Sequence, residues 1–232
     1  MSANDVLELQ ERVVECRACP RLVAWREKVA EEKRAAFADE DYWGAPVPGF
    51  GDPEAGLLVV GLAPAAHGAN RTGRMFTGDR SGDWLYAAMH RAGFASQPES
   101  THRGDGLELT DAWVTAPVRC APPQNRPKPA ERDNCADWLS REFEALERVR
   151  VAVVLGGYGW TAFLRVLRSR DWDLPVPQPK FGHMARAELE GEGRRLSLVG
   201  SYHPSQQNTF TGTLTEEMFD EVWATARELL SA

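Results

Sequence analysis

Four short runs of apolar residues recur along the chain, and stretches with the spacing of amphipathic helices separate them. The runs are rich in residues that favour strands, and they occupy positions 57–63, 112–118, 151–157 and 196–202. In the other stretches, apolar residues return every three or four positions, which is the period of a helix with one buried face. These stretches are 81–93, 129–148, 157–169 and 215–230. Strands that alternate with helices indicate a parallel sheet covered on both faces, so we expect a single α/β/α domain.

The first fifty residues have a different pattern. Helical spacing predicts helices over 3–15 and 21–38, and a connector rich in Pro and Gly follows at 42–56. Near the other end, Thr215 precedes the last predicted helix, but Met218 stands where a capping box has Glu. The capping motif is therefore only half present.

The composition is that of an ordinary soluble globular protein. Of the 232 residues, 43% are hydrophobic and 26% are charged. No apolar run approaches the roughly 20 residues that span a bilayer. The acidic N-terminus lacks the basic and then apolar order of a signal peptide. We therefore expect a cytoplasmic protein without membrane association.

The net charge of −7 is opposite in sign to that of most nucleic-acid-binding domains. Exposed charges are screened beyond about 8–10 Å, however, so this net charge is compatible with a local basic groove. The loops that follow the predicted strands would bring six cations to one edge of the sheet, namely Arg71, Arg74, Arg80, Arg119, Arg126 and Lys128. Such a basic rim would suit phosphates. The alternative is an ordinary solvated loop edge.

The four cysteines form two pairs, Cys16 with Cys19 and Cys120 with Cys135. A disulfide across so short a loop as C-x2-C would be strained, and a cytosolic setting disfavours it further. Either the four are unrelated buried thiols, or they form one site that ties the N-terminus to the middle of the chain. Four thiolates suit structural zinc or an iron–sulfur cluster, and the spacing alone does not choose between the two.

Asp79 and His203 are the ionisable residues best placed for catalysis. Each lies in a loop that follows a predicted strand, at the edge where ligands bind in such sheets, and His changes its charge near neutral pH. His67 competes for the same role from the first loop. Each residue also has a structural alternative: Asp79 would cap the helix that begins near Ser81, and His203 would only support its loop.

Two further residues suit the recognition of a planar ring. Asn125 offers a donor and an acceptor for the edge of a base, and Phe76 would stack on its face. Alternatively, Asn125 holds its Pro-rich loop and Phe76 packs in the interior. The sequence lacks the GxxxxGK[ST], GxGxxG and GxSxG motifs, which disfavours nucleotide-dependent enzymes and a hydrolase triad.

Three motifs and the cysteine spacing together resemble the uracil-DNA glycosylase superfamily, and within it family five of the iron–sulfur branch. The motifs are GLAPAAHGANRTGRMFTGD at 61–79, CAPPQNRPKP at 120–129 and SYHPSQQNTFTG at 201–212. The resemblance extends from about residue 14 to residue 230, so it covers nearly the whole chain.

The resemblance implies a three-layer α/β/α sandwich with a central four-stranded parallel sheet, in one domain of residues 1–232. It also implies a [4Fe–4S] cluster that ties the N-terminal helices to this domain, with zinc as the alternative; the ligands would be Cys16, Cys19, Cys120 and Cys135. The implied activity is hydrolysis of the N-glycosidic bond of a deaminated base that is flipped out of DNA. We expect a monofunctional, monomeric, nucleoid-associated enzyme that leaves an abasic site in double- or single-stranded DNA.

The resemblance also assigns roles to single residues. The family's acid corresponds to Asp79, which would stabilise positive charge on the sugar and orient water, and its HPS histidine corresponds to His203, which would stabilise negative charge on the departing base. The base would contact Ala63, Pro64, Ala65, Ala66, Phe76 and Asn125. The DNA strand would contact Arg71, Arg74, Arg126, Ser205, Gln206, Gln207, Asn208 and Thr209.

The chain also departs from related families. Leu62 and Ala63 stand where better-known branches have an acid or amide, and Ala116 stands where family four has Asn. We therefore expect few base-specific hydrogen bonds and a broad substrate range that includes uracil and hypoxanthine. Three rival interpretations remain: a non-catalytic DNA-damage-binding protein on the same fold, a cluster-bearing redox protein, and a thymine- or purine-directed glycosylase.

Overall fold

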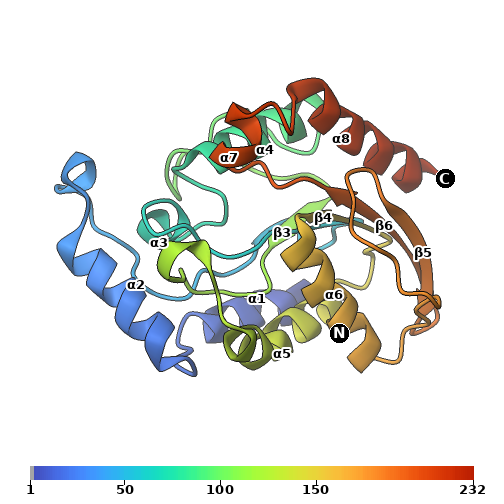
Figure 1. The fold of residues 1–232 in the computed structure, drawn as a ribbon, viewed down its shortest axis with the longest axis horizontal. Helices are drawn as coiled ribbons and strands as arrows, with labels where there is room; N and C mark the ends of the chain where they lie inside the picture. The colour runs from blue at the N-terminus through green and yellow to red at the C-terminus, as the bar shows by residue number, and fades with distance from the viewer. Residues whose placement is uncertain (1–2) are drawn as a thin grey trace.

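One sheet with the strand order β1-β3-β2-β4-β6-β5 forms the centre of the computed structural model, which describes residues 3–232 (Figure 1). Its four inner strands are parallel and correspond to the four apolar runs: β2 (Leu57–Val60), β3 (Ala112–Thr115), β4 (Val151–Leu155) and β6 (Arg194–Ser201). The expected four-stranded parallel sheet is thus confirmed as the core of a larger one. Two antiparallel edge strands, β1 (Phe50–Gly51) and β5 (Arg186–Gly191), were not expected and make six strands in total.

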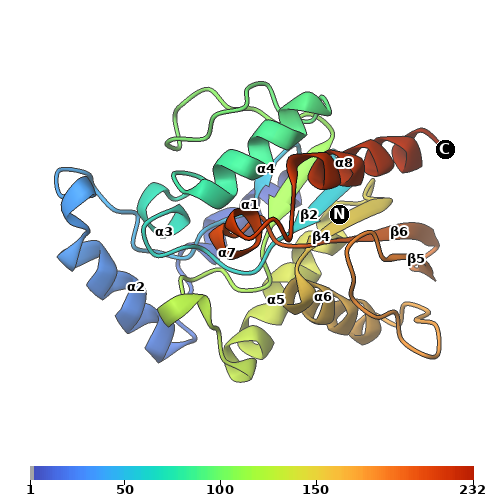
Figure 2. The same cartoon turned by 45° about the horizontal axis from the view of Figure 1, so that its top comes forward.

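The sheet is covered by helices on both faces, as the alternation of elements predicted. Side chains of a strand point alternately to the two faces. Leu57 and Val59 of β2 pack in the core that also contains side chains of α4 (Arg80–Arg91) and α8 (Glu216–Ser231). Leu58 and Val60 pack on the opposite side, with side chains of α1 (Ala3–Val13), α5 (Pro129–Ala145) and α6 (Gly157–Ser169). Figures 1 and 2 show the same two helical layers, one on each side of the sheet.

Four further helices follow predicted stretches, with one correction near the N-terminus: α1 (Ala3–Val13), α2 (Pro20–Glu32), α5 (Pro129–Ala145) and α6 (Gly157–Ser169). Two short helices, α3 (Ala69–Thr72) and α7 (Gln206–Phe210), were not predicted. The predicted helix over 21–38 ends at Glu32, because Lys33 adopts a φ of 51°, and a short 3-10 turn at Ala35–Phe37 follows. At the start of α8, the Thr215 side chain accepts a hydrogen bond from Met218 N at 3.2 Å, so half a capping box is present.

The carboxyl ends of the parallel strands lie at one edge of the sheet, and three of the loops that follow them meet there. The β2 loop leads through α3 to α4, the β3 loop leads to α5, and the β6 loop leads to α7. Ligands bind at this edge in sheets of this kind. Among the described residues, no helix is both long and apolar enough to cross a membrane.

Candidate active site

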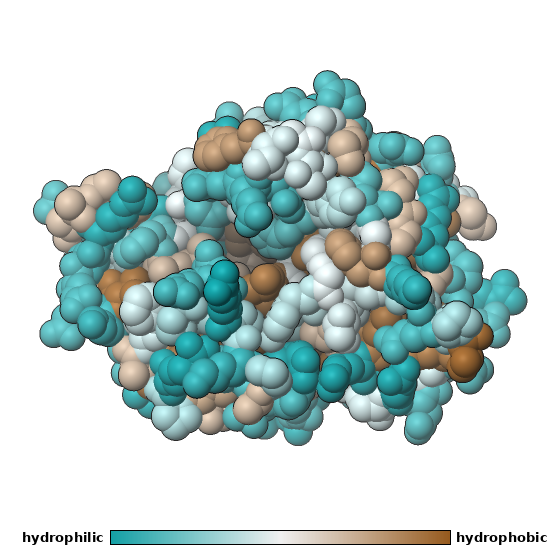
Figure 3. Space-filling model, viewed as in Figure 1, coloured by the Kyte–Doolittle hydropathy of each residue, from teal (hydrophilic) through white to brown (hydrophobic). Residues whose placement is uncertain are grey.

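A cavity of about 220 Å³ opens where these three loops meet. Figure 3 shows the corresponding face hollowed near its centre, with pale and brown surface framed by hydrophilic residues. The cavity is lined by Leu62, Ala63, Pro64, Ala65, Ala69, Met75, Phe76, Asp79, Ser81, Ala116, Asn125, His203 and Ser205. Most of the candidate catalytic and base-contacting residues are therefore brought together in one small pocket.

Asp79 enters the cavity from the N-terminus of α4. Its carboxylate caps this helix by accepting a hydrogen bond from Gly82 N at 3.1 Å, so the expected alternative role of Asp79 as a helix cap is confirmed. Burial raises the pKa of Asp79, although the backbone N–H groups of Gly82 and Ser81 oppose this shift. Gly68 leaves room for the carboxylate, because a Cβ there would lie 1.9 Å from Asp79 Oδ2. The capping bond fixes the carboxylate at the cavity wall.

His203 also lines the cavity, from the loop between β6 and α7. Burial lowers its pKa to about 4, so the imidazole is neutral at physiological pH and carries one N–H donor and one acceptor. The ring packs against Phe76, with centroids 5.8 Å apart and planes inclined by 31°. The Asn208 side chain donates to the His203 carbonyl at 2.8 Å, which holds the loop in place. His67, the competing histidine, hydrogen-bonds to Tyr42 and does not line the cavity.

Phe76 is held in an unusual backbone conformation. Its φ is 51°, a region that L residues rarely adopt, and its ring lies against Gly61 at the end of β2. A Cβ on Gly61 would lie 2.7 Å from the ring. The close approach of ring and strand makes Phe76 part of the pocket wall, beside the imidazole of His203.

The remaining wall is mostly apolar. Leu62, Ala63 and Ala116 line the cavity at the positions where related families carry polar side chains, and Asn125 contributes an amide at the exposed rim. Ala66 is not among the lining residues; its carbonyl accepts a hydrogen bond from Asn70. The sequence interpretation missed Ala69, Met75 and Ser81 as lining residues. Only Ser81 carried a signal, since it lies in the first turn of the helix that Asp79 caps.

Arg71 and Arg74 do not lie on an exposed basic rim. Both are buried, and their guanidinium groups pair with Glu40 and Asp105. They also hold the loop that carries the acid: Arg71 donates to the Gly78 carbonyl at 2.9 Å, and Arg74 to Thr77 Oγ1 at 2.9 Å. We therefore do not retain them as phosphate contacts, because a buried and paired guanidinium is not available to a DNA strand.

Arg119 is the third expected rim residue that lies in the interior. It pairs with the buried Glu142, which also accepts hydrogen bonds from Trp113 and Thr115. The exposed members of the expected rim are Arg80, Arg126 and Lys128. The basic rim is thus half as large as the sequence predicted.

The segment expected to contact DNA forms a short helix beside the cavity. Ser205 caps α7 by accepting from Asn208 N at 3.4 Å, and Gln206 and Gln207 are exposed. Thr209 lies on the same helix. At its end the ring of Phe210 is 66% exposed, with the guanidinium of Arg80 4.6 Å from its centroid.

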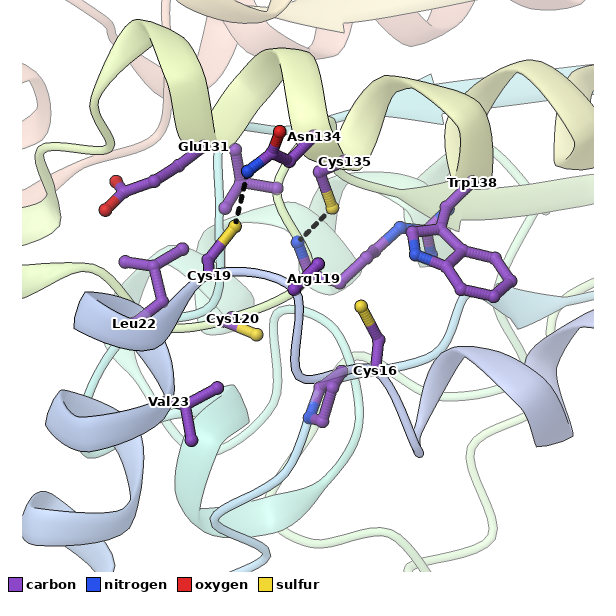
Figure 4. A pocket seen from close by; sticks show the side chains of 13 residues that line it. Cys16, Cys19, Leu22, Val23, Arg119, Cys120, Glu131, Asn134, Cys135 and Trp138 are labelled. Carbon is purple, nitrogen blue, oxygen red and sulfur yellow. Dashed lines mark hydrogen bonds between the residues drawn. The ribbon is translucent and has the colours of Figure 1, made fainter.

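The four cysteines line a second, smaller pocket together (Figure 4). Cys16 and Cys19 precede α2, Cys120 follows β3, and Cys135 lies in α5; their sulfur atoms face a common space in Figure 4. This arrangement brings the N-terminal segment next to the β3 loop, as expected if the four cysteines form one site. Among the described residues, no three His, Cys, Asp or Glu side chains converge as ligands of a single metal ion.

The surroundings of the four thiols suit a negatively charged group. Three donors point at sulfur: Arg26 Nη1 at 2.9 Å from Cys120, Arg119 N at 3.4 Å from Cys135 and Asn134 Nδ2 at 3.6 Å from Cys19. Burial raises the pKa of free Cys120 to about 11 and that of Cys135 to about 12, so without a metal these thiols would be neutral. Donors and a buried cation around four sulfurs fit thiolates that ligate a metal group.

Comparison with known proteins agrees with this fold. The chain belongs to the uracil DNA glycosylase superfamily, whose family model matches residues 48–227. It is similar to the Type-5 uracil-DNA glycosylase of Mycobacterium tuberculosis, with 53% identity over 98% of this chain and 82% of the relative. The Thermus thermophilus protein of the same name is 53% identical over 92% of this chain and 93% of its own length. The Type-4 uracil-DNA glycosylase of Archaeoglobus fulgidus is more distant, at 29% over 68% of this chain.

Proposed function

We propose that this protein excises uracil from DNA by hydrolysing the N-glycosidic bond and leaves an abasic site. The observation that carries the proposal is the 220 Å³ cavity whose lining includes Asp79, Phe76 and the neutral His203. The cavity is smaller than the roughly 300–1,000 Å³ of pockets for larger ligands, which suits one flipped base. The names of the type-5 relatives support the same activity.

Asp79 acts on the sugar side of the reaction. Breaking the bond builds positive charge on the sugar, and a nearby carboxylate stabilises this charge and orients the attacking water. The cap bond from Gly82 N to Oδ1 holds the carboxylate in place. A carboxylate that is already held in place needs little reorganisation during the reaction.

His203 acts on the departing base. The base leaves as an anion, and a neutral imidazole can donate its N–H to the developing negative charge on a base oxygen. A histidine with a pKa of about 4 keeps this neutral form across the physiological range. Phe76 provides a face for the ring, and Ala63, Pro64, Ala65 and Asn125 contact its edge.

The apolar wall supports a broad substrate range. Leu62, Ala63 and Ala116 offer no side-chain hydrogen bonds to a base, and a pocket without such bonds discriminates weakly between rings of similar size. We therefore propose hypoxanthine as a second substrate. The exposed cations Arg80 and Arg126 would contact phosphates, and Ser205 with the α7 residues would lie against the DNA strand.

The four cysteines are proposed to hold a [4Fe–4S] cluster with a structural role. Its support is the set of hydrogen-bond donors around the sulfurs, which suits the thiolates of a charged metal group. When bound, the cluster would cross-link α2, the β3 loop and α5. That the protein is a nucleoid-associated, cytoplasmic monomer in one domain remains a prediction.

Labelled duplexes that contain one uracil or one hypoxanthine test the proposal. We expect strand scission at both lesions only after alkali, since a monofunctional glycosylase leaves the backbone intact. Asp79→Asn is the matched control: it should lower single-turnover cleavage by roughly 10²–10⁴-fold while DNA binding is retained.

Three results would change the interpretation. Scission at uracil alone would remove the broad-pocket argument. No scission by protein with intact cluster absorbance would favour a DNA-damage-binding protein. Asp79→Asn with wild-type turnover would show that another group carries the chemistry.

A further inference from the structure

Arg26 is a buried cation on α2 beside the cysteine pocket. Only 2% of its surface is exposed. Its Nη1 donates to Cys120 Sγ at 2.9 Å, and both terminal nitrogens lie 3.3 Å from the Cys16 carbonyl oxygen. Its Nε has no hydrogen-bond partner among the described residues. The guanidinium is therefore directed at two of the four cysteines.

Neighbouring arginines are neutralised by carboxylates, and Arg26 is not. Arg119 pairs with Glu142, and Arg21 pairs with Glu131 at 2.7 Å. Within residues 3–232, no carboxylate lies within ion-pair distance of Arg26. The charge of Arg26 contributes to the lowered pKa of Glu27, but the Glu27 side chain is half-exposed and forms an ion pair with Arg17.

A buried and unpaired cation is strongly unfavourable unless a negative group compensates it. The Cys16 backbone carbonyl supplies only a partial negative charge. Four thiolates around an iron–sulfur core supply a net negative charge, because the ligands outweigh the charge of the core. Net charge and hydrogen bonds to sulfur are also among the factors that set the reduction potential of such clusters.

We propose that Arg26 is the counter-ion of the cluster: its charge and its N–H···S bond to Cys120 raise the cluster's reduction potential and slow its loss. This inference rests on the proposed four-cysteine cluster, but it does not depend on the substrate. Arg26 is a positioning and charge-compensating residue, and it has no role in base excision.

The test compares Arg26→Met, Arg26→Lys and the control Arg17→Gln in anaerobically purified full-length protein. Arg26→Met fills a similar volume without charge, Arg26→Lys keeps the charge with a different donor geometry, and Arg17→Gln removes an exposed charge next to Cys16. The readouts are iron and sulfide content, reduction potential, and the rate at which a chelator bleaches the visible absorbance.

We expect Arg26→Met to have a lower reduction potential and roughly 10–100-fold faster bleaching, as for other partners of metal ligands. Arg26→Lys should fall between Arg26→Met and wild type, and Arg17→Gln should match wild type. If Arg26→Met does not fold, Arg26→Lys still tests the N–H···S bond to Cys120. A wild-type reduction potential and bleaching rate in Arg26→Lys would overturn the role of this bond, and a lowered reduction potential would support it.

The outcomes test the role of Arg26 separately from the presence of the cluster. Wild-type protein without iron and sulfide would overturn both. Wild-type protein with a cluster, and Arg26→Met with the same potential and bleaching rate, would overturn only the role of Arg26. If Arg26 only fills space in the interior, Arg26→Met should keep the wild-type potential and bleaching rate, since an apolar side chain often replaces a buried charge without loss of stability.

Discussion

In the proposed mechanism, Asp79 combines a structural and a chemical role in one side chain. It caps α4, and it carries a buried charge at the cavity wall. Asn caps helices as well as Asp, so Asp79→Asn removes the charge and keeps the cap, whereas Asp79→Ala removes both. The pair of variants therefore separates the two roles.

At pH 7 we expect Asp79→Asn to be more stable than wild type, and Asp79→Ala to be about 0.5–2 kcal/mol less stable than Asp79→Asn. The folded-state pKa of Asp79 is raised, so its protonated form favours folding below the unfolded value of about 3.9. This contribution is lost as the pH rises through the folded pKa. Urea unfolding at pH 7 measures the difference, and a less stable Asp79→Asn would contradict the burial argument.

The same carboxylate should set the acid limb of the pH–rate profile. Turnover should fall as the pH decreases through the raised pKa of Asp79, because the reaction needs the ionised form, while His203 stays neutral down to about pH 4. Single-turnover rates measured against pH should place the midpoint above about 3.9. Asp83→Asn is the control, since burial also raises the pKa of Asp83. A limb that persists in the residual activity of Asp79→Asn would belong to another group.

At the scale of elements, the loop that carries Phe76 and Asp79 depends on a distant loop. Arg74 and Asp105 form a buried ion pair at 2.7 Å. Burial opposes the ionisation of Asp105, but hydrogen bonds from Arg74 and from the N–H groups of Leu107 and Thr101 outweigh it and hold its pKa well below the usual range. The 94–111 segment thus anchors the loop that carries Phe76 and Asp79.

Asp105→Asn should lower the free energy of unfolding by roughly 3–5 kcal/mol, because it leaves the Arg74 cation buried without its partner. The control, Asp220→Asn, breaks an exposed pair in which both side chains are 43% exposed, and it should have an effect of at most about 1 kcal/mol. Urea unfolding of the two variants tests the comparison. Equal effects would mean that burial does not determine the strength of the Arg74 pair.

The parallel strands were predictable because they are buried on both faces and appear as continuous apolar runs. The edge strands were not: β5 has one buried residue, Leu189, and β1 has two residues inside a Pro/Gly-rich connector. The cavity was predictable in outline because its residues follow strand ends. The burial of Arg71, Arg74 and Arg119 was not, because their carboxylate partners lie 23 to 31 residues away in sequence.

At the scale of the whole molecule, the two large hydrophobic cores do not include the cysteine pocket. One core lies under α4 and α8 and the other under α1, α5 and α6, and Cys120 belongs to a small separate cluster with Leu22 and Val118. The sheet should therefore fold without the proposed iron–sulfur cluster, while the position of α2 should depend on it.

Cys16→Ser should give colourless protein with nearly wild-type far-UV circular dichroism and rapid proteolysis confined to residues 14–45. Loss of one of the four proposed cluster ligands would free the α2 segment, while the sheet and its helices keep their own cores. Mass spectrometry of limited digests locates the cleavage sites. Cleavage throughout the chain, or loss of the dichroism signal, would mean that the cysteine pocket supports the entire fold.

The cap formed by Asp79 has an evolutionary consequence. Asp codons become Asn codons by a single G-to-A transition, and this transition is the one that an unrepaired cytosine deamination on the complementary strand produces. Because Asn preserves the cap of α4, the resulting protein would fold and bind lesions but cut them roughly 10²–10⁴-fold more slowly. A genome that fails to repair its own copy of this gene at codon 79 would thus acquire a slow enzyme that occupies the lesions it should remove.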